Sequence, residues 1–182
     1  MQRAIVTPAD MAGAALSELK SWLAITTTRD DSGLVTLLQA ALDMCEAFTG
    51  LMPLATSCEE MLAPLGTWQM LRTRPVQAIR GVARRDATGA WRDLPVTDYA
   101  IDLLADGSGR LRLMAGASDA PLRVTFTAGL AEEWSSLPAA LRHGIVRLAA
   151  DQFEQRGTSA ARTAPPACVV ALWQPWRRLR LT

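Results

Sequence analysis

The chain has 182 residues, with 19 basic and 18 acidic side chains, so its formal net charge is only +1. A hydrophobic content of 49% and a charged content of 20% are typical of a globular protein and argue against a general polyanion binder. No apolar run approaches the roughly 20 residues that a membrane span needs, and the start of the chain has no apolar signal region. We therefore expect neither membrane insertion nor secretion.

Residues 1–54 predict a pair of helices. In residues 9–25, apolar side chains recur at helical spacing, and residues 33–49 repeat the pattern. Asp31 or Ser32 is the expected N-cap of the second helix, and Gly50 is its expected end. The short polar link between the two segments predicts an antiparallel arrangement.

Residues 55–128 predict an antiparallel β region. Short alternating segments are separated by turn signals, of which 86–89 (DATG) and 107–109 (GSG) are the clearest. Strands at such short spacing favour a meander with one face exposed to water. Both turns are expected to be exposed tips that tolerate insertions.

Residues 129–157 predict the long helix around which the chain is organised. Pro138 can occupy the first helical turn, and Gly157 can end the helix. Leu141, Ile145 and Leu148 lie on one helical face with Ala149 and Phe153. The predicted fold class is therefore α+β: a helical frame of about four helices, an inserted antiparallel β region, and an extended C-terminal tail over residues 158–182.

The tail carries the strongest functional signal. From Gly157 onward there are four arginines and no acidic residue, whereas residues 1–156 have 15 basic and 18 acidic groups. Trp and Arg are the commonest anchors of protein interfaces, so the predicted partner-binding residues are Trp173, Pro175, Trp176, Arg177, Arg178, Leu179, Arg180 and Leu181. Two alternatives stay open: the tail folds back on its own core, or it contacts nucleic acid. If it binds a partner, removing residues 165–182 leaves the melting temperature unchanged.

Candidates for catalysis are weak. His143 is the only histidine, the three cysteines lie far apart, and no phosphate-binding glycine motif is present. The sequence predicts no catalytic residue, no metal site, no cofactor and no disulfide, and hence a protein that is not an enzyme.

An ordered series of short motifs resembles the head–tail connector, or adaptor, proteins of tailed phages and gene transfer agents. The features that carry the resemblance span nearly the whole chain. They are 19–23 (LKSWL), 34–50 with its Phe48-Thr49-Gly50 end, 74–76 (RPV), 124–129 (VTFTAG), 137–141 (LPAAL) and the end from Pro165-Pro166 to Leu181.

The resemblance implies a structural role in the neck of a phage-like particle assembled in the bacterial cytoplasm. Such proteins form a ring, expected to be dodecameric, beneath the portal protein. A tail-completion or stopper protein attaches below, and DNA passes through the channel without sequence-specific binding. The C-terminal end would reach the portal. The alternative function is a DNA-binding packaging component that uses the arginine-rich tail.

Overall fold

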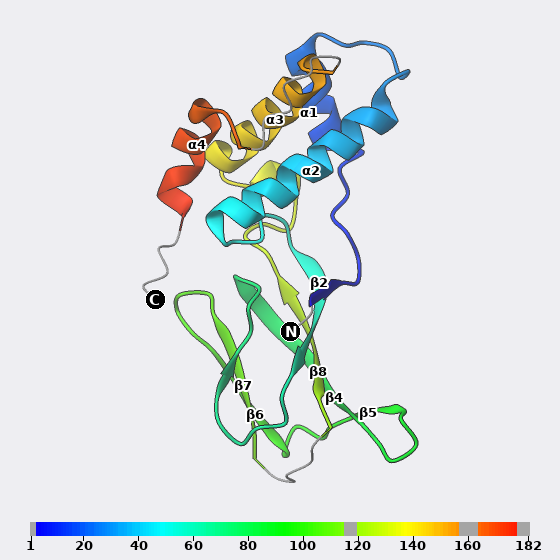
Figure 1. Ribbon diagram of the computed structural model, residues 1–182, viewed down its shortest axis with the longest axis vertical. Coiled ribbons are helices and arrows are strands. Elements are labelled where there is room, and N and C mark those ends of the chain that lie inside the picture. Colours follow the sequence, from blue (N-terminus) through cyan, green and yellow to red (C-terminus); the bar gives the residue numbers. More distant parts are fainter. Residues whose placement is uncertain (1–2, 115–119, 157–163, 178–182) are drawn as a thin grey trace. The chain divides into compact units, whose positions relative to one another are not determined.

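The computed structural model describes residues 3–114, 120–156 and 164–177. The chain forms two compact units, one from Met1–Pro8 and Ala55–Leu130 and the other from Ala9–Leu54 and Ala131–Thr182 (Figure 1). The described residues contain four α-helices and antiparallel sheets, which confirms the predicted α+β class.

The first unit, called the β unit here, contains two sheets. The larger has the order β1 (Arg3–Ile5), β2 (Thr56–Leu62), β8 (Leu122–Ala128), β4 (Val76–Arg85) and β5 (Trp91–Asp93). The smaller has the order β3 (Gln69–Met70), β7 (Gly109–Leu113) and β6 (Tyr99–Leu103).

The predicted meander is wrong, because β8 lies between β2 and β4 and pairs with both. Its alternate residues, Leu122, Val124, Phe126 and Ala128, are completely buried. This regularly alternating strand lies at the centre of the sheet, where neighbours on both sides satisfy its backbone.

The strand β1 is not expected from the sequence. Its three residues are too few to show a period, and the sequence groups residues 1–8 with the helical pair. In the structure Arg3 lies opposite Glu60 and Ile5 opposite Cys58, so this segment extends the sheet of the β unit.

The two predicted turns differ in environment. The turn at 86–89 is an exposed hairpin between β4 and β5, in which Gly89 donates to the carbonyl of Asp86 at 3.0 Å. The turn at 107–109 is packed, because Ser108 is only 1% exposed. A Cβ on Gly107 would lie 2.8 Å from Cβ of Pro75. The expected tolerance to insertion therefore does not extend to this second turn.

The second unit, called the helical unit here, contains α1 (Ala14–Leu23), α2 (Asp31–Thr49), α3 (Ala139–Glu154) and α4 (Ala167–Trp173) (Figure 1). Two 3₁₀ turns complete it, η1 (Trp134–Ser136) and η2 (Gln174–Trp176). Helix α3 contacts each of the other three helices, as expected for the organising element. Its completely buried residues Leu141, Ile145 and Ala149 form the predicted apolar face.

The helix ends follow the sequence signals only in part. Gly50 ends α2 with a φ of 73° and donates to the carbonyl of Glu46, as predicted. The capping prediction is wrong, because no side chain caps α2 and the carboxylate of Asp31 instead accepts a hydrogen bond of 2.7 Å from Lys20 of α1. Helix α1 begins only at Ala14, since the backbone before it turns around the side chain of Asp10. Gly157, the expected end of α3, lies outside the described residues.

The cysteines allow a simple test of the packing. Burial raises the pKa of the Cys45 thiol to about 12, helped by the nearby charge of Glu46. At pH 8 this thiol stays protonated, and protonated thiols are poor nucleophiles. Cys58 is also buried, whereas Cys168 is half-buried. We expect one thiol per chain to react promptly with a maleimide at pH 8, and all three in denaturant, as counted by mass spectrometry. Prompt labelling of Cys45 would contradict this packing.

Candidate functional site

Trp173 is predicted from the sequence to anchor a partner, but the structure places it in the core of the helical unit. It is the largest of the completely buried side chains among the described residues. Its indole Nε1 donates to the carbonyl of Leu141 at 3.4 Å, and its ring lies 5.9 Å from the ring of Phe48. Trp173 therefore stabilises the unit and is not exposed to a partner.

The close approach of α4 to α3 depends on Gly144. A Cβ built there would lie 2.9 Å from Cδ1 and Cε2 of Trp173, and closer still to its Nε1. Only a glycine leaves room for the indole at this point of the helix. Gly144 is not expected from the sequence as a packing residue, although a glycine in a helix interior is a signal of close packing.

Residues after Trp173 stay at the surface. Pro175 is exposed in η2, Trp176 is half-buried and Arg177 is exposed. The guanidinium of Arg177 lies 5.3 Å from the ring centre of Phe48, within the range of a cation–π contact. The contacts among Phe48, Trp173 and Arg177 therefore hold the end of η2 against the C-terminal end of α2.

The predicted tail thus divides at Arg177. Residues from Ala167 to Trp173 fold back on the helical unit, which is one of the open alternatives. Arg178, Leu179, Arg180 and Leu181 lie outside the described residues. Removal of residues 165–182 would take Trp173 out of the core, so the expected unchanged melting temperature does not fit the structure.

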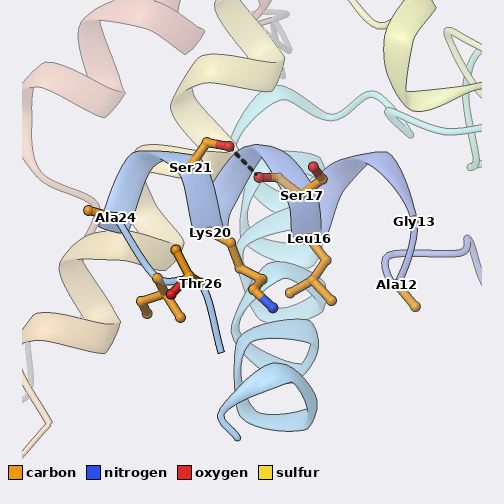
Figure 2. A pocket seen from close by; sticks show the side chains of 9 residues that line it. Ala12, Gly13, Leu16, Ser17, Lys20, Ser21, Ala24 and Thr26 are labelled. Atoms are coloured by element: carbon orange, nitrogen blue, oxygen red, sulfur yellow. Dashed lines mark hydrogen bonds between the residues drawn. The ribbon is translucent and has the colours of Figure 1, made fainter. Parts of the chain in front are cut away.

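A shallow groove of about 510 Å³ runs along α1 (Figure 2). Two of its four polar side chains are already bonded: Lys20 donates to Asp31, and the hydroxyl of Ser21 donates to the carbonyl of Ser17 at 2.9 Å. None of the lining residues is an acid, a histidine or a cysteine that could activate these hydroxyls. The lining of the groove therefore lacks the side chains that activate a hydroxyl in a hydrolytic site.

Neither a metal cluster nor a membrane span occurs within the described ranges. They contain no group of three or more His, Cys, Asp or Glu side chains arranged to hold a metal ion. No helix within them is both long and apolar enough to cross a bilayer.

Comparison with solved structures gives matches over the whole chain. A chain in the neck of an empty gene transfer agent (GTA) particle computed with C6 symmetry matches with a TM-score of 0.83 and 24% identity. Chains in the virion of a native GTA particle and in the neck of a native GTA particle computed with C12 symmetry match with TM-scores of 0.80 and 0.79, each at 24% identity. Each match covers 100% of this chain and 98% of the other.

No family model and no curated protein sequence matches the chain. The resemblance drawn from scattered motifs is nevertheless confirmed at the level of the fold. From end to end, the chain has the fold of a protein found in the neck and virion of gene transfer agent particles.

Proposed function

We propose that the protein is a structural head–tail connector of a phage-like particle. Copies form a ring beneath the portal, a stopper or tail-completion protein attaches below, and the ring joins the DNA-filled head to the tail. The observation that carries this proposal is the full-length likeness to chains of the GTA neck. A neck computed with C12 symmetry supports a ring of twelve copies.

In this proposal the C-terminal end contacts the portal. Packing of Trp173 against α3, and of Arg177 against Phe48, fixes the point from which Arg178 to Leu181 follow. A preordered attachment point reduces the entropy lost when the remaining residues bind. The described residues of the helical unit have six basic and ten acidic side chains, a net charge of −4, so the basic end of the chain differs in charge from the unit that carries it.

Shortening the chain tests the portal contact. A chain ending at Arg177 should keep its melting temperature, because Trp173 and its contacts remain, and it should yield filled heads without tails. Electron microscopy of particles and a thermal melt of the purified protein measure the two results. Tailed particles at the normal yield would place the portal contact elsewhere. A lower melting temperature would show that residues 178–182 belong to the core.

Matched substitutions separate the apolar and the charged contributions. Trp176→Ala should weaken portal binding by about tenfold or more, as expected for an interface hot spot. Arg178→Ala should weaken it by a smaller factor, of about fivefold or less, and should reduce the dependence on salt. Binding of purified portal at several salt concentrations distinguishes the two. Tight, strongly salt-dependent binding to duplex DNA instead would favour a packaging role.

A further inference from the structure

The β unit carries two segments of opposite charge that meet in sequence at residue 93. Residues 80–93 hold four arginines and two aspartates, a net charge of +2. Residues 94–106 hold three aspartates and no basic residue, a net charge of −3. The first segment lies on the β4–β5 hairpin and the second contains β6.

The basic surface is a rigid hairpin. One of its carboxylates, Asp86, accepts hydrogen bonds from the Thr88 hydroxyl at 2.6 Å and from Arg92 Nε at 2.6 Å. These bonds hold the pKa of Asp86 at about 2, well below its ordinary value. Next to the turn, the guanidinium groups of Arg85 and Arg123 lie over the ring of Trp91, at 5.1 and 4.7 Å from its centre. The hairpin is thus ordered before it meets any partner.

The negatively charged segment contains an edge strand, β6, whose exposed side chains include large aliphatic ones. β6 ends the three-stranded sheet, and its only ladder partner among the described strands is β7. Ile101 and Leu103 are 45% and 44% exposed, and Val96 just before the strand is 78% exposed. β6 has no proline, lysine or bulge, three of the usual protections of an edge strand. Such a surface is a template for another chain.

We propose that β6 and the residues before it, 94–103, bind the β4–β5 hairpin of a second copy of this chain. The proposal rests on the proposed ring function and names the surfaces that join neighbouring subunits. Because the two surfaces differ, each copy offers one of them to each neighbour. Such heterologous contacts generate a ring when the rotation closes. The charge difference orients the pairing, and the exposed aliphatic side chains are covered by it.

Ion pairs within the chain involve two of the three aspartates of residues 94–106. Asp102 binds Arg110 at 2.7 Å, and Asp106 lies 3.9 Å from Arg74. The carboxylate of Asp98 accepts a hydrogen bond only from the neutral hydroxyl of Thr97 among the contacts of its described neighbours. Arg85 is exposed beside Trp91. Asp98 and Arg85 therefore remain available for contacts between subunits.

Cysteine cross-linking in assembled particles tests the pairing. In a Cys168→Ser chain, Ala87→Cys places a thiol at the exposed hairpin turn and Leu103→Cys places one on β6. The double variant, treated with a short bismaleimide, should give a ladder of cross-linked species from dimer up to the whole ring on a denaturing gel. Each single variant should remain monomeric on the same gel, because a heterologous contact does not bring identical residues together.

Other results would overturn the proposal. Dimers without higher species, or dimers from a single variant, would indicate a symmetric contact between like surfaces. No cross-links in particles that retain a ring by electron microscopy would place the subunit contact elsewhere while the connector function stands. Absence of the chain from the neck would contradict the connector function itself.

Charge reversal is an independent test that needs no cross-linker. Arg85→Glu and Asp98→Arg should each reduce the yield of tailed particles at least tenfold, and the two changes together in one chain should recover most of it. Circular dichroism of each purified variant checks the fold. If a correctly folded double variant does not recover the yield of tailed particles, that result would contradict a charge-oriented contact between these two surfaces.

Discussion

Trp173→Ala is expected to destabilise the helical unit by about 3–5 kcal/mol, the range measured for removal of large buried aromatic side chains. The indole is completely buried and fills the space between α3, α4 and Phe48, so its loss leaves a cavity that the helix backbones cannot close. Trp176→Ala is the matched control. Its side chain is half-buried at the surface, and we expect a loss of about 1 kcal/mol or less. Urea titration of both purified variants measures the difference.

A substitution at Gly144 makes this test more specific, because its effect on stability should have opposite signs in the natural chain and in the Trp173→Ala variant. In the natural chain, Gly144→Ala places a methyl group against the Trp173 ring and should cost about 1–3 kcal/mol by overpacking. In the Trp173→Ala background the obstacle is gone, and the higher helix propensity of alanine should stabilise the protein by up to about 1 kcal/mol. Equal effects in the two backgrounds would show that the two residues are not coupled.

The sequence predicts the periodic parts of this fold well. The α+β class, α2 with its end at Gly50, and α3 with its buried face all follow from apolar spacing that depends on local backbone geometry. The order of strands does not, because pairing between β2 and β8 joins residues far apart in the chain. A meander is the simplest arrangement of successive strands, and it fails where a late strand is inserted between two early ones.

The candidate site shows a different limit. A run with two tryptophans and several arginines looks the same whether its aromatic residues bind a partner or the protein's own core. Composition supports both, and it does not distinguish Trp173 from Trp176. Gly144, in the preceding helix, is what separates them, because it opens room for one indole only. For the predicted partner-binding residues from Pro175 onward, partner binding remains a proposal. It rests on the position of Arg177 and the sequence that follows it.

Glu60→Ala is expected to have a comparably large effect in the β unit. Glu60 is only 2% exposed on β2. Its carboxylate accepts hydrogen bonds from the backbone N–H groups of Arg72 and Thr73, each at 2.9 Å, and from the Thr73 hydroxyl at 2.6 Å. The side chain thus fixes the loop that leads into β4. Truncation would leave these donors without an acceptor in a buried site, at a cost of about 3–5 kcal/mol in total.

Two neighbouring variants make this prediction specific. In Glu60→Gln the amide group keeps the shape but must turn a donor toward at least one N–H, so we expect a loss of about 1–3 kcal/mol. Glu59 points to the opposite face of the strand, where it is partly exposed and lies 3.9 Å from Arg123. Glu59→Ala should therefore cost about 1 kcal/mol or less. In thermal melts, Glu60→Ala should have the lowest melting temperature, followed by Glu60→Gln and then by Glu59→Ala. Equal melting temperatures for the two alanine variants would mean that Glu60 does not hold the loop, and that the packing before β4 comes from the apolar residues around Leu71 and Val76 alone.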